Sequence, residues 1–204
     1  MADVSEVADA LVQIISGAVY PSGLGQPSVG DCPIIVYQGW PNPQTLDVDM
    51  AAGKVHISVY PRPGDAITSI MMGDTEWVET ANNGTTGTSA REVRRQNKQF
   101  QISIWSPTPQ LRDLIAKPVD LALALTSRMT MADGSQAIVT YVNLTQRDEQ
   151  QKAMIYRRDF FYAVNYAIVQ IDSEYTVLQT ITNVTTGPTD AASGSTITTT
   201  TPST

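Results

Sequence analysis

The sequence predicts an α+β fold, in which an antiparallel, sandwich-like β-sheet carries an N-terminal helix and a central helix packed on it. Apolar residues recur at intervals of three and four near the start of the chain and again after residue 109, as on one face of a helix. Between these stretches, apolar and polar residues alternate as in half-buried strands, and two long β-rich segments follow the second helix. The element order is therefore helix, several strands, helix and two strands.

The first element is an amphipathic helix. Asp3 and Glu6 have the spacing of a capping box, with Asp3 in the cap position. Residues 20–23, with a Pro and a Gly, end the helix, and a surface connection rich in Gly, Pro and Ser follows. The apolar face of the helix comprises Val4, Val7, Ala8, Leu11, Val12, Ile15 and Val19.

Four strands are expected next. Residues 34–37 form a short apolar run, and residues 54–60 alternate, so that one face meets the core and the other meets solvent or a neighbour. Pro61 and Pro63 are expected to close that strand. Residues 76–81 and 92–105 are predicted strands, and residues 82–89 between them are polar and contain Gly, which is typical of a long, mobile hairpin connection.

The central helix is expected to begin near Pro107 and Pro109. Pro118 should interrupt or kink it, and the alternation of residues 119–125 leaves a strand open, although their Ala and Leu content favours a helix. Two strands, residues 137–144 and 154–171, then flank a charged turn at residues 146–150. The apolar positions at helical spacing are Leu111, Leu114, Ile115, Ala122 and Leu125.

The chain is expected to form one domain, residues 1–186, followed by a C-terminal extension, residues 187–204. A length of 204 residues suffices for one good hydrophobic core. The extension consists of Thr, Ser and other small or polar residues around Ile197, so it should not fold alone. Because Thr and Ile are β-branched, Ser195–Thr200 suits an extended arm that docks on a strand edge of an adjacent subunit or of the next ring.

Composition excludes several classes of protein. A net charge of -7 and a pI near 4.6 argue against a protein that wraps nucleic acid. Cys32 is the only cysteine, so neither an intrachain disulfide nor a cysteine-based zinc cluster is expected. The acidic start lacks the pattern of a signal peptide, and no stretch approaches the roughly 20 apolar residues of a membrane-spanning helix. We therefore expect no membrane anchor and synthesis in a reducing cytoplasm.

No motif indicates catalysis, a cofactor or a metal ion. His56 is the sole histidine, and it lies within a predicted strand without a nucleophile motif, which favours a structural or surface role. The Asp47-Val48-Asp49 run lacks the further acidic positions of a calcium loop and is interpreted as a solvated turn. Gly23 and Gly25 follow a helix, whereas a phosphate-binding loop follows a strand, so they indicate a plain loop. We predict a protein that is not an enzyme.

Basic residues form the candidate site. Three interpretations compete: a subunit interface, a solvated strand face and a contact to passing DNA. In an acidic protein, pairing with acidic groups across a subunit boundary is the natural use of such residues, so a subunit interface is favoured. The aromatic residues, Trp40, Trp77 and Trp105 among them, are spread over separate segments and favour core and interface packing over a stacking platform. The candidate interface residues are Arg91, Arg94, Arg95, Lys98, Arg157 and Arg158.

Residues 94–107 (RRQNKQFQISIWSP), which run into a helix beginning QLRD, resemble the middle of bacteriophage tail-terminator and neck (head-tail joining) proteins. Residues 156–166 (YRRDFFYAVNY) resemble the final strand of these proteins, and the opening helix also matches. The resemblance covers roughly residues 1–171 in the order of elements. It departs at residues 39–63, which are longer and richer in Pro, and after residue 172.

The resemblance implies a ring-forming subunit of the virion. Such a subunit closes a homo-oligomeric, hexameric ring that caps the tail tube, contacts the head connector and neck proteins and, where present, the tail sheath, and leaves a channel through which genomic DNA passes without specific binding. Ring closure would hide sheet edges that otherwise pair at random. The alternatives are another virion subunit, such as a head-completion, tube-initiating or baseplate protein, and a secreted adhesion domain with a Thr-rich stalk.

Overall fold

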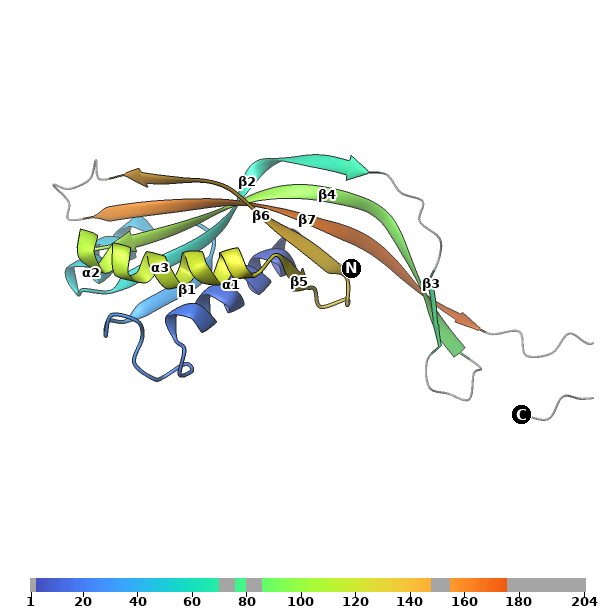
Figure 1. Ribbon diagram of the computed structural model, residues 1–204, viewed down its shortest axis with the longest axis horizontal. Helices are drawn as coiled ribbons and strands as arrows, with labels where there is room; N and C mark the ends of the chain where they lie inside the picture. Colours follow the sequence, from blue (N-terminus) through green and yellow to red (C-terminus); the bar gives the residue numbers. More distant parts are fainter. Residues whose placement is uncertain (1–2, 70–75, 80–85, 148–154, 176–204) are drawn as a thin grey trace, which may run out of the picture.

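A computed structural model describes residues 3–69, 76–79, 86–147 and 155–175, and the structural statements that follow refer to these residues. The model confirms the predicted α+β class (Figure 1). The helices are α1 (Val4–Val19), α2 (Pro43–Ala51) and α3 (Pro109–Leu125). The strands are β1 (Ile34–Gln38), β2 (Val55–Ser69), β3 (Glu76–Glu79), β4 (Thr86–Ser106), β5 (Arg128–Thr130), β6 (Gln136–Arg147) and β7 (Tyr156–Tyr175).

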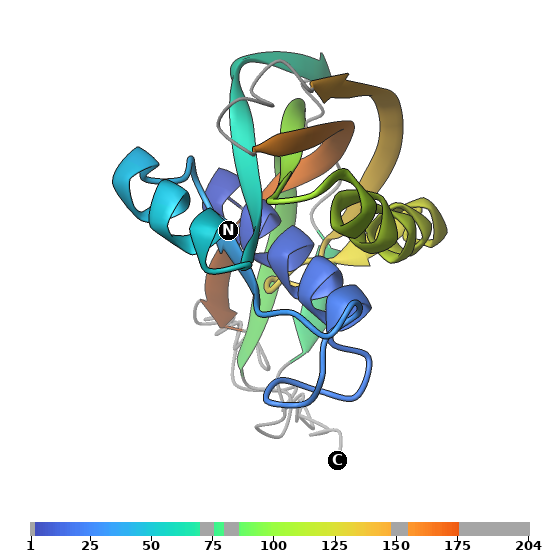
Figure 2. The ribbon, with the colours of Figure 1, turned by 90° about the vertical axis from the view of Figure 1, so that its left-hand side faces the viewer.

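The strands form one curled sheet in the order β1-β2-β4-β7-β6-β5, and β3 pairs with β4 (Figure 2). The β1 and β2 strands are parallel, and every other described pair is antiparallel. The long β4 and β7 strands lie at the centre and continue past the helices to the end of the molecule that carries β3 (Figure 1). The two outer strands of the main path are therefore β1 on one side and β5, with the longer β6 behind it, on the other.

Register places the apolar side chains of the central strands on one face. Ile102 lies between Val59 of β2 and Phe160 of β7, and all three are buried. Helices α1 and α3 cover this face, and their buried side chains join the same core. Burial of each such side chain contributes about 1.5–3 kcal/mol, so this layer accounts for most of the fold's stabilisation. The predicted alternation of residues 100–104 is confirmed.

Helix α1 begins as the sequence predicts. The Asp3 carboxylate accepts a hydrogen bond of 2.7 Å from the Val4 N–H, and the Glu6 carboxylate accepts one of 3.2 Å from the Asp3 N–H, which completes the capping box. Val7, Leu11 and Ile15 face the core. The predicted apolar stripe and its cap thus define this helix correctly at both ends.

Helix α3 differs from expectation in its continuity through Pro118 and in the face that it buries. It runs without interruption through Pro118, so the strand alternative for residues 119–125 is wrong. Proline removes an intrahelical hydrogen bond, but Leu114, whose carbonyl loses its partner, lies on the solvent side, where water can satisfy it. The buried side of the helix is formed by Ile115, Ala116, Val119 and Leu123, with Arg112, whereas Leu114, Leu121 and Leu125 are exposed.

Three further elements differ from the prediction. Residues 43–51 form α2, although Asp47 and Asp49 were expected in a turn; Asn42 caps this helix and Pro43 occupies its first position. The β2 strand continues through Pro61 and Pro63 with a register shift, because these residues lie beyond the end of β1 and need no outward N–H. The β4 strand already begins at residue 86, so residues 86–89 are strand, while 82–85 lie outside the described residues. None of the described helices is long and apolar enough to cross a membrane.

Candidate functional site

The second face of the sheet carries several buried polar residues, among them His56, Ser58 and Asp159. Helix α2 packs there through Leu46 and Met50, which form a small core with Trp105 and Ile155. His56 and Ser58 of β2 point to the same face and are buried, although this side of the strand was expected to meet solvent or a neighbour. They are buried because α2, whose residues were expected to form a turn, covers this face.

His56 lies between α2 and β1. Its Nε2 is 3.1 Å from the Asp49 carboxylate, and its Nδ1 is 3.3 Å from the Tyr37 hydroxyl. Lys54 makes a second ion pair with Asp49, at 2.8 Å. Burial, and then the nearby Asp49 charge, raise the pKa of Tyr37 to about 12, so its hydroxyl stays protonated and can donate to His56. Both ring nitrogens of His56 are thus engaged within the protein.

This arrangement fits a structural role for His56 better than a catalytic one. General base catalysis needs a ring nitrogen within hydrogen-bond reach of a substrate, and here both nitrogens are occupied by side chains of the same subunit. Hydrogen bonds from Lys54 lower the pKa of Asp49, as does its charge, with a smaller contribution from His56. Among the described residues, no three His, Cys, Asp or Glu side chains gather as a metal site.

A second polar cluster surrounds Arg157. Its guanidinium lies 4.7 Å from the ring centroid of Trp40 and 4.4 Å from that of Trp105, and the two indoles meet edge to face at 5.5 Å. The buried Asp159 accepts hydrogen bonds of 2.6 Å from both Arg157 and Ser103. The cluster is an internal cation–π stack that fixes the loop carrying Trp40 to the sheet. Trp105 lies in a strand that its alternating residues predict, whereas Trp40 lies in a Pro-rich loop, where no local pattern indicates its contact.

The structure does not gather the predicted basic residues into one patch. Arg95 lies opposite Ala167 and Arg157 lies opposite Trp105, ten residue steps apart on β4, or about 33 Å. Arg94 is exposed on the helix-covered side, whereas Arg95 faces the other side and binds Glu92 and Asn165.

The remaining members of the set are also dispersed. Arg158 binds Gln146 and lies 3.5 Å from Asp113 of α3. The Lys98 ammonium lies 3.5 Å from the Gly64 carbonyl. Arg91 of β4 lies opposite Gln170 of β7, and its side chain lies outside the described part. An interface role for these residues stays a prediction, and Arg94 is the member with the most exposed position.

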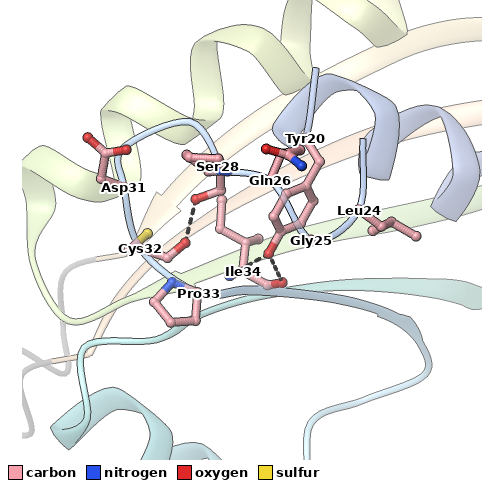
Figure 3. A pocket seen from close by; sticks show the side chains of 10 residues that line it. Tyr20, Leu24, Gly25, Gln26, Ser28, Asp31, Cys32, Pro33 and Ile34 are labelled. Atoms are coloured by element: carbon pink, nitrogen blue, oxygen red, sulfur yellow. Dashed lines mark hydrogen bonds between the residues drawn. The ribbon is translucent and has the colours of Figure 1, made fainter. Parts of the chain in front are cut away.

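The outer edge of β1 is covered by α1 and the loop that follows it. The Tyr20 hydroxyl accepts a hydrogen bond of 3.0 Å from the Ile34 N–H and donates one of 2.7 Å to the Ile34 carbonyl (Figure 3). The Gln38 amide at the other end of β1 donates to the Ser5 carbonyl and to Asp9 of α1. The same loop carries Gly23 and Gly25 at positive φ, as a plain loop allows, and borders an open hollow that includes Cys32.

The edge of β2 beyond β1 is protected by its composition. Pro61 and Pro63 lack the N–H groups that a further strand would need; Pro63 is exposed and Pro61 is half-buried. Gly39 donates the last backbone hydrogen bond on this side, to the Val59 carbonyl at 2.9 Å. On this side of the sheet, side chains and prolines therefore block strand addition.

The edge of β6 has no comparable protection within the described residues. The β5 strand pairs with β6 only at residues 136–138, and Val139 donates one more hydrogen bond to the Ser127 carbonyl. From Thr140 to Thr145, the pairing found for β6 among the described residues is with β7 alone. Tyr141, Val142 and Leu144 in this segment are exposed by 53%, 44% and 38%. We call residues 140–145 the free β6 edge; the strand was predicted from its residues, but they carry no signal for its position in the sheet.

Comparison with solved structures finds weak similarities. A protein from the virion of a native gene transfer agent particle is similar over 81% of this chain and 98% of its own length, with 12% sequence identity and a TM-score of 0.41. A second solved protein is similar over 81% of this chain and 96% of its own, with 13% identity and a TM-score of 0.38. No family model matches the chain, and no curated protein does so either. A likeness of this degree does not define the function.

Proposed function

We propose that this chain is a structural virion subunit of the tail-terminator or neck type, which forms a ring on the tail tube and joins it to the head connector. The observation that carries the proposal is the asymmetry of the sheet: one edge is closed by side chains and prolines, and the free β6 edge is open and apolar. A head-to-tail ring needs two different surfaces on each subunit, one that accepts and one that is presented. An open edge that can accept a strand supplies the first of them.

The segments that carry the family resemblance support this function. Residues 94–107 form most of the second half of β4 and lead into α3, and residues 156–166 form the first half of β7. These segments are neighbours in the sheet, with Ile102 opposite Phe160. They thus form one structural unit, the central strand pair with its covering helix, which is the unit expected of such a subunit.

The polar side chains also support a role in binding. The buried polar clusters around His56 and Arg157 are satisfied within the subunit, which leaves them without groups aimed at a substrate. The formal charge of -7 would let DNA pass through a channel without adhering to its wall. Arg94 and Lys98 are the predicted interface residues that we retain as charge partners for an adjacent subunit.

The test is the oligomeric state of the purified full-length chain. We expect a mass of about six copies in sedimentation and a ring with a central hole in negative-stain images. Addition of purified tail tubes should place that ring at one end of the tube. A compact monomer at all concentrations, with no binding to tubes, would overturn the proposal.

A further inference from the structure

We infer that the free β6 edge is the docking site for the C-terminal segment of a neighbouring copy, which adds to the sheet as an extra strand. This inference rests on the proposed ring and deepens it, because it names the contact between adjacent subunits. Strand addition supplies affinity through backbone hydrogen bonds and specificity through alternate side chains. Both contributions can be traced in the described residues.

The accepting edge is long enough for such a contact. Residues 140–145 match the common length of a strand, and their pairing within the described residues is with β7 on one side only. The segment contains neither a proline nor a charged residue. Soluble proteins usually protect edges with charges, prolines or covering elements, and a long edge that lacks them is a template for pairing.

The flank of this edge is apolar on the side that carries α3. Tyr141 lies opposite Tyr162 and Leu144 opposite Phe160, so both point toward the helix-covered face. Tyr141 packs edge to face against Tyr162 at 5.6 Å, and the Tyr162 hydroxyl donates to Asp120 of α3 at 3.2 Å. This chain of contacts connects Tyr141 to α3 through β7. An added strand would cover Tyr141 and Leu144 with its own side chains.

The β1 and β2 edges of a second copy are blocked as the source of that strand, and pairing of two β6 edges would join only two copies and would not close a head-to-tail ring. In a second copy, Tyr20 already bonds the backbone of Ile34, and Pro61 and Pro63 interrupt the donors of β2. A segment outside these edges has to supply the strand. Ser195–Thr200 combines β-branched residues with the absence of proline and charge, which suits an extended, added strand.

The position of the β7 end favours a neighbouring copy over the same subunit. Tyr175 lies opposite Thr86 at the end of the sheet away from the helices, and β7 runs outward there (Figure 1). Tyr162, the partner of Tyr141, is 13 residue steps back along β7, or about 43 Å. The 29 residues from 176 to 204 can span up to about 100 Å, so they reach an adjacent subunit without reversing direction.

Disulfide trapping between two differently marked full-length chains tests the inference. In a Cys32→Ser background, one chain carries Thr140→Cys, and the other carries a cysteine at Thr196, Thr198 or Thr200 to cover the register. After the two chains are mixed and oxidised, we expect a linked heterodimer for at least one register. The control chain carries Ile35→Cys, at an exposed position of β1, and should give no link.

A charged edge should abolish the link without unfolding the subunit. Val142→Lys in the Thr140→Cys chain is expected to lower the yield to that of the Ile35→Cys control, whereas Val142→Thr keeps it, with equal melting temperatures. If rings form but no register links, or if links form only within one chain that carries both cysteines, the inference fails while the ring stands. If the unmodified chain forms no ring, the proposed function fails first.

Discussion

The two outer sides of the sheet both end in the edge of a strand, but one edge is closed to a further strand and the other is open. On the β1 and β2 side, the Tyr20 hydroxyl bonds both polar groups of Ile34, and Pro61 and Pro63 remove donors where β1 ends. On the β6 side, residues 140–145 expose apolar side chains and pair with β7 alone among the described residues. Strand addition is therefore blocked on the β1 and β2 side, and we propose that the β6 side accepts one partner. In this view, residues at the closed edge act in folding, and residues at the open edge act in assembly.

A substitution in the central strand pair, between these two edges, should lower the free energy of unfolding the most. Arg157→Ala should destabilise the subunit by about 3–5 kcal/mol, because it leaves the buried Asp159 carboxylate without its cation. Arg94→Ala, at an exposed site in the neighbouring β4 strand, should change stability by no more than about 0.5 kcal/mol. Urea unfolding measures both, and equal effects would contradict an internal role for Arg157.

The same substitution at the two edges gives the next largest effect. Tyr20→Phe should cost about 1–3 kcal/mol, since it leaves the N–H and carbonyl of Ile34 without their partner. Tyr141→Phe removes a hydroxyl from the free β6 edge, where it is exposed, and should be neutral within about 0.5 kcal/mol. Chemical denaturation of both variants decides whether the β1 edge is protected by this hydroxyl.

Removal of the prolines should turn the closed edge into an open one. With Pro61→Thr and Pro63→Thr together, the β2 edge gains two N–H groups. Two copies of this variant should then associate about tenfold more tightly than two copies of the parent chain, which corresponds to about 1.4 kcal/mol of binding free energy. Sedimentation across a concentration series measures this association. Tyr141→Pro on the opposite edge is the matched control, because the N–H of Tyr141, like that of Val139, points away from β7, and it should weaken association. Unchanged behaviour of both variants would remove the distinction between the edges.

The smallest effect is expected at the ion pairs that hold α2 to the closed side. The pKa of Asp49 is lowered in the folded protein, so its stabilisation is present above the ordinary value of 3.8 and is lost as the pH falls through the lowered value. Asp49→Asn should therefore be less stable than the parent chain at pH 7, with the gap closing below about pH 4. Asp47→Asn, at an exposed position of the same helix, is the control and should change stability at pH 7 by no more than about 0.5 kcal/mol.

The periodic elements could be predicted from the sequence because their signals are local. The capping box of α1 and the alternation of residues 100–104 depend on neighbouring residues, and both are confirmed. The leucines of α3 misled the prediction, since Leu114 and Leu125 fit a helical stripe that faces solvent in the folded chain. Nothing local distinguishes an apolar stripe that meets the core from one reserved for a partner.

The candidate site could be predicted only in part, because it depends on the order of the strands. Residues 137–144 were recognised as strand, yet their exposed edge follows from β5 being shorter than β6. The basic residues were close in sequence or similar in type, but alternation sends Arg94 and Arg95 to opposite faces. The contact of Trp40 with Arg157 joins segments more than a hundred residues apart, for which a single sequence offers no indication.

The Trp40–Arg157–Trp105 stack also gives the protein an optical probe that requires no label. Trp105 is 6% exposed and Trp40 is 49% exposed, so a small quencher in water reaches one indole of the pair and not the other. The guanidinium that lies against both rings should perturb their emission as long as the loop stays on the sheet. In a Trp77→Phe background, tryptophan emission should therefore follow the detachment of this loop separately from the unfolding of the core beneath it.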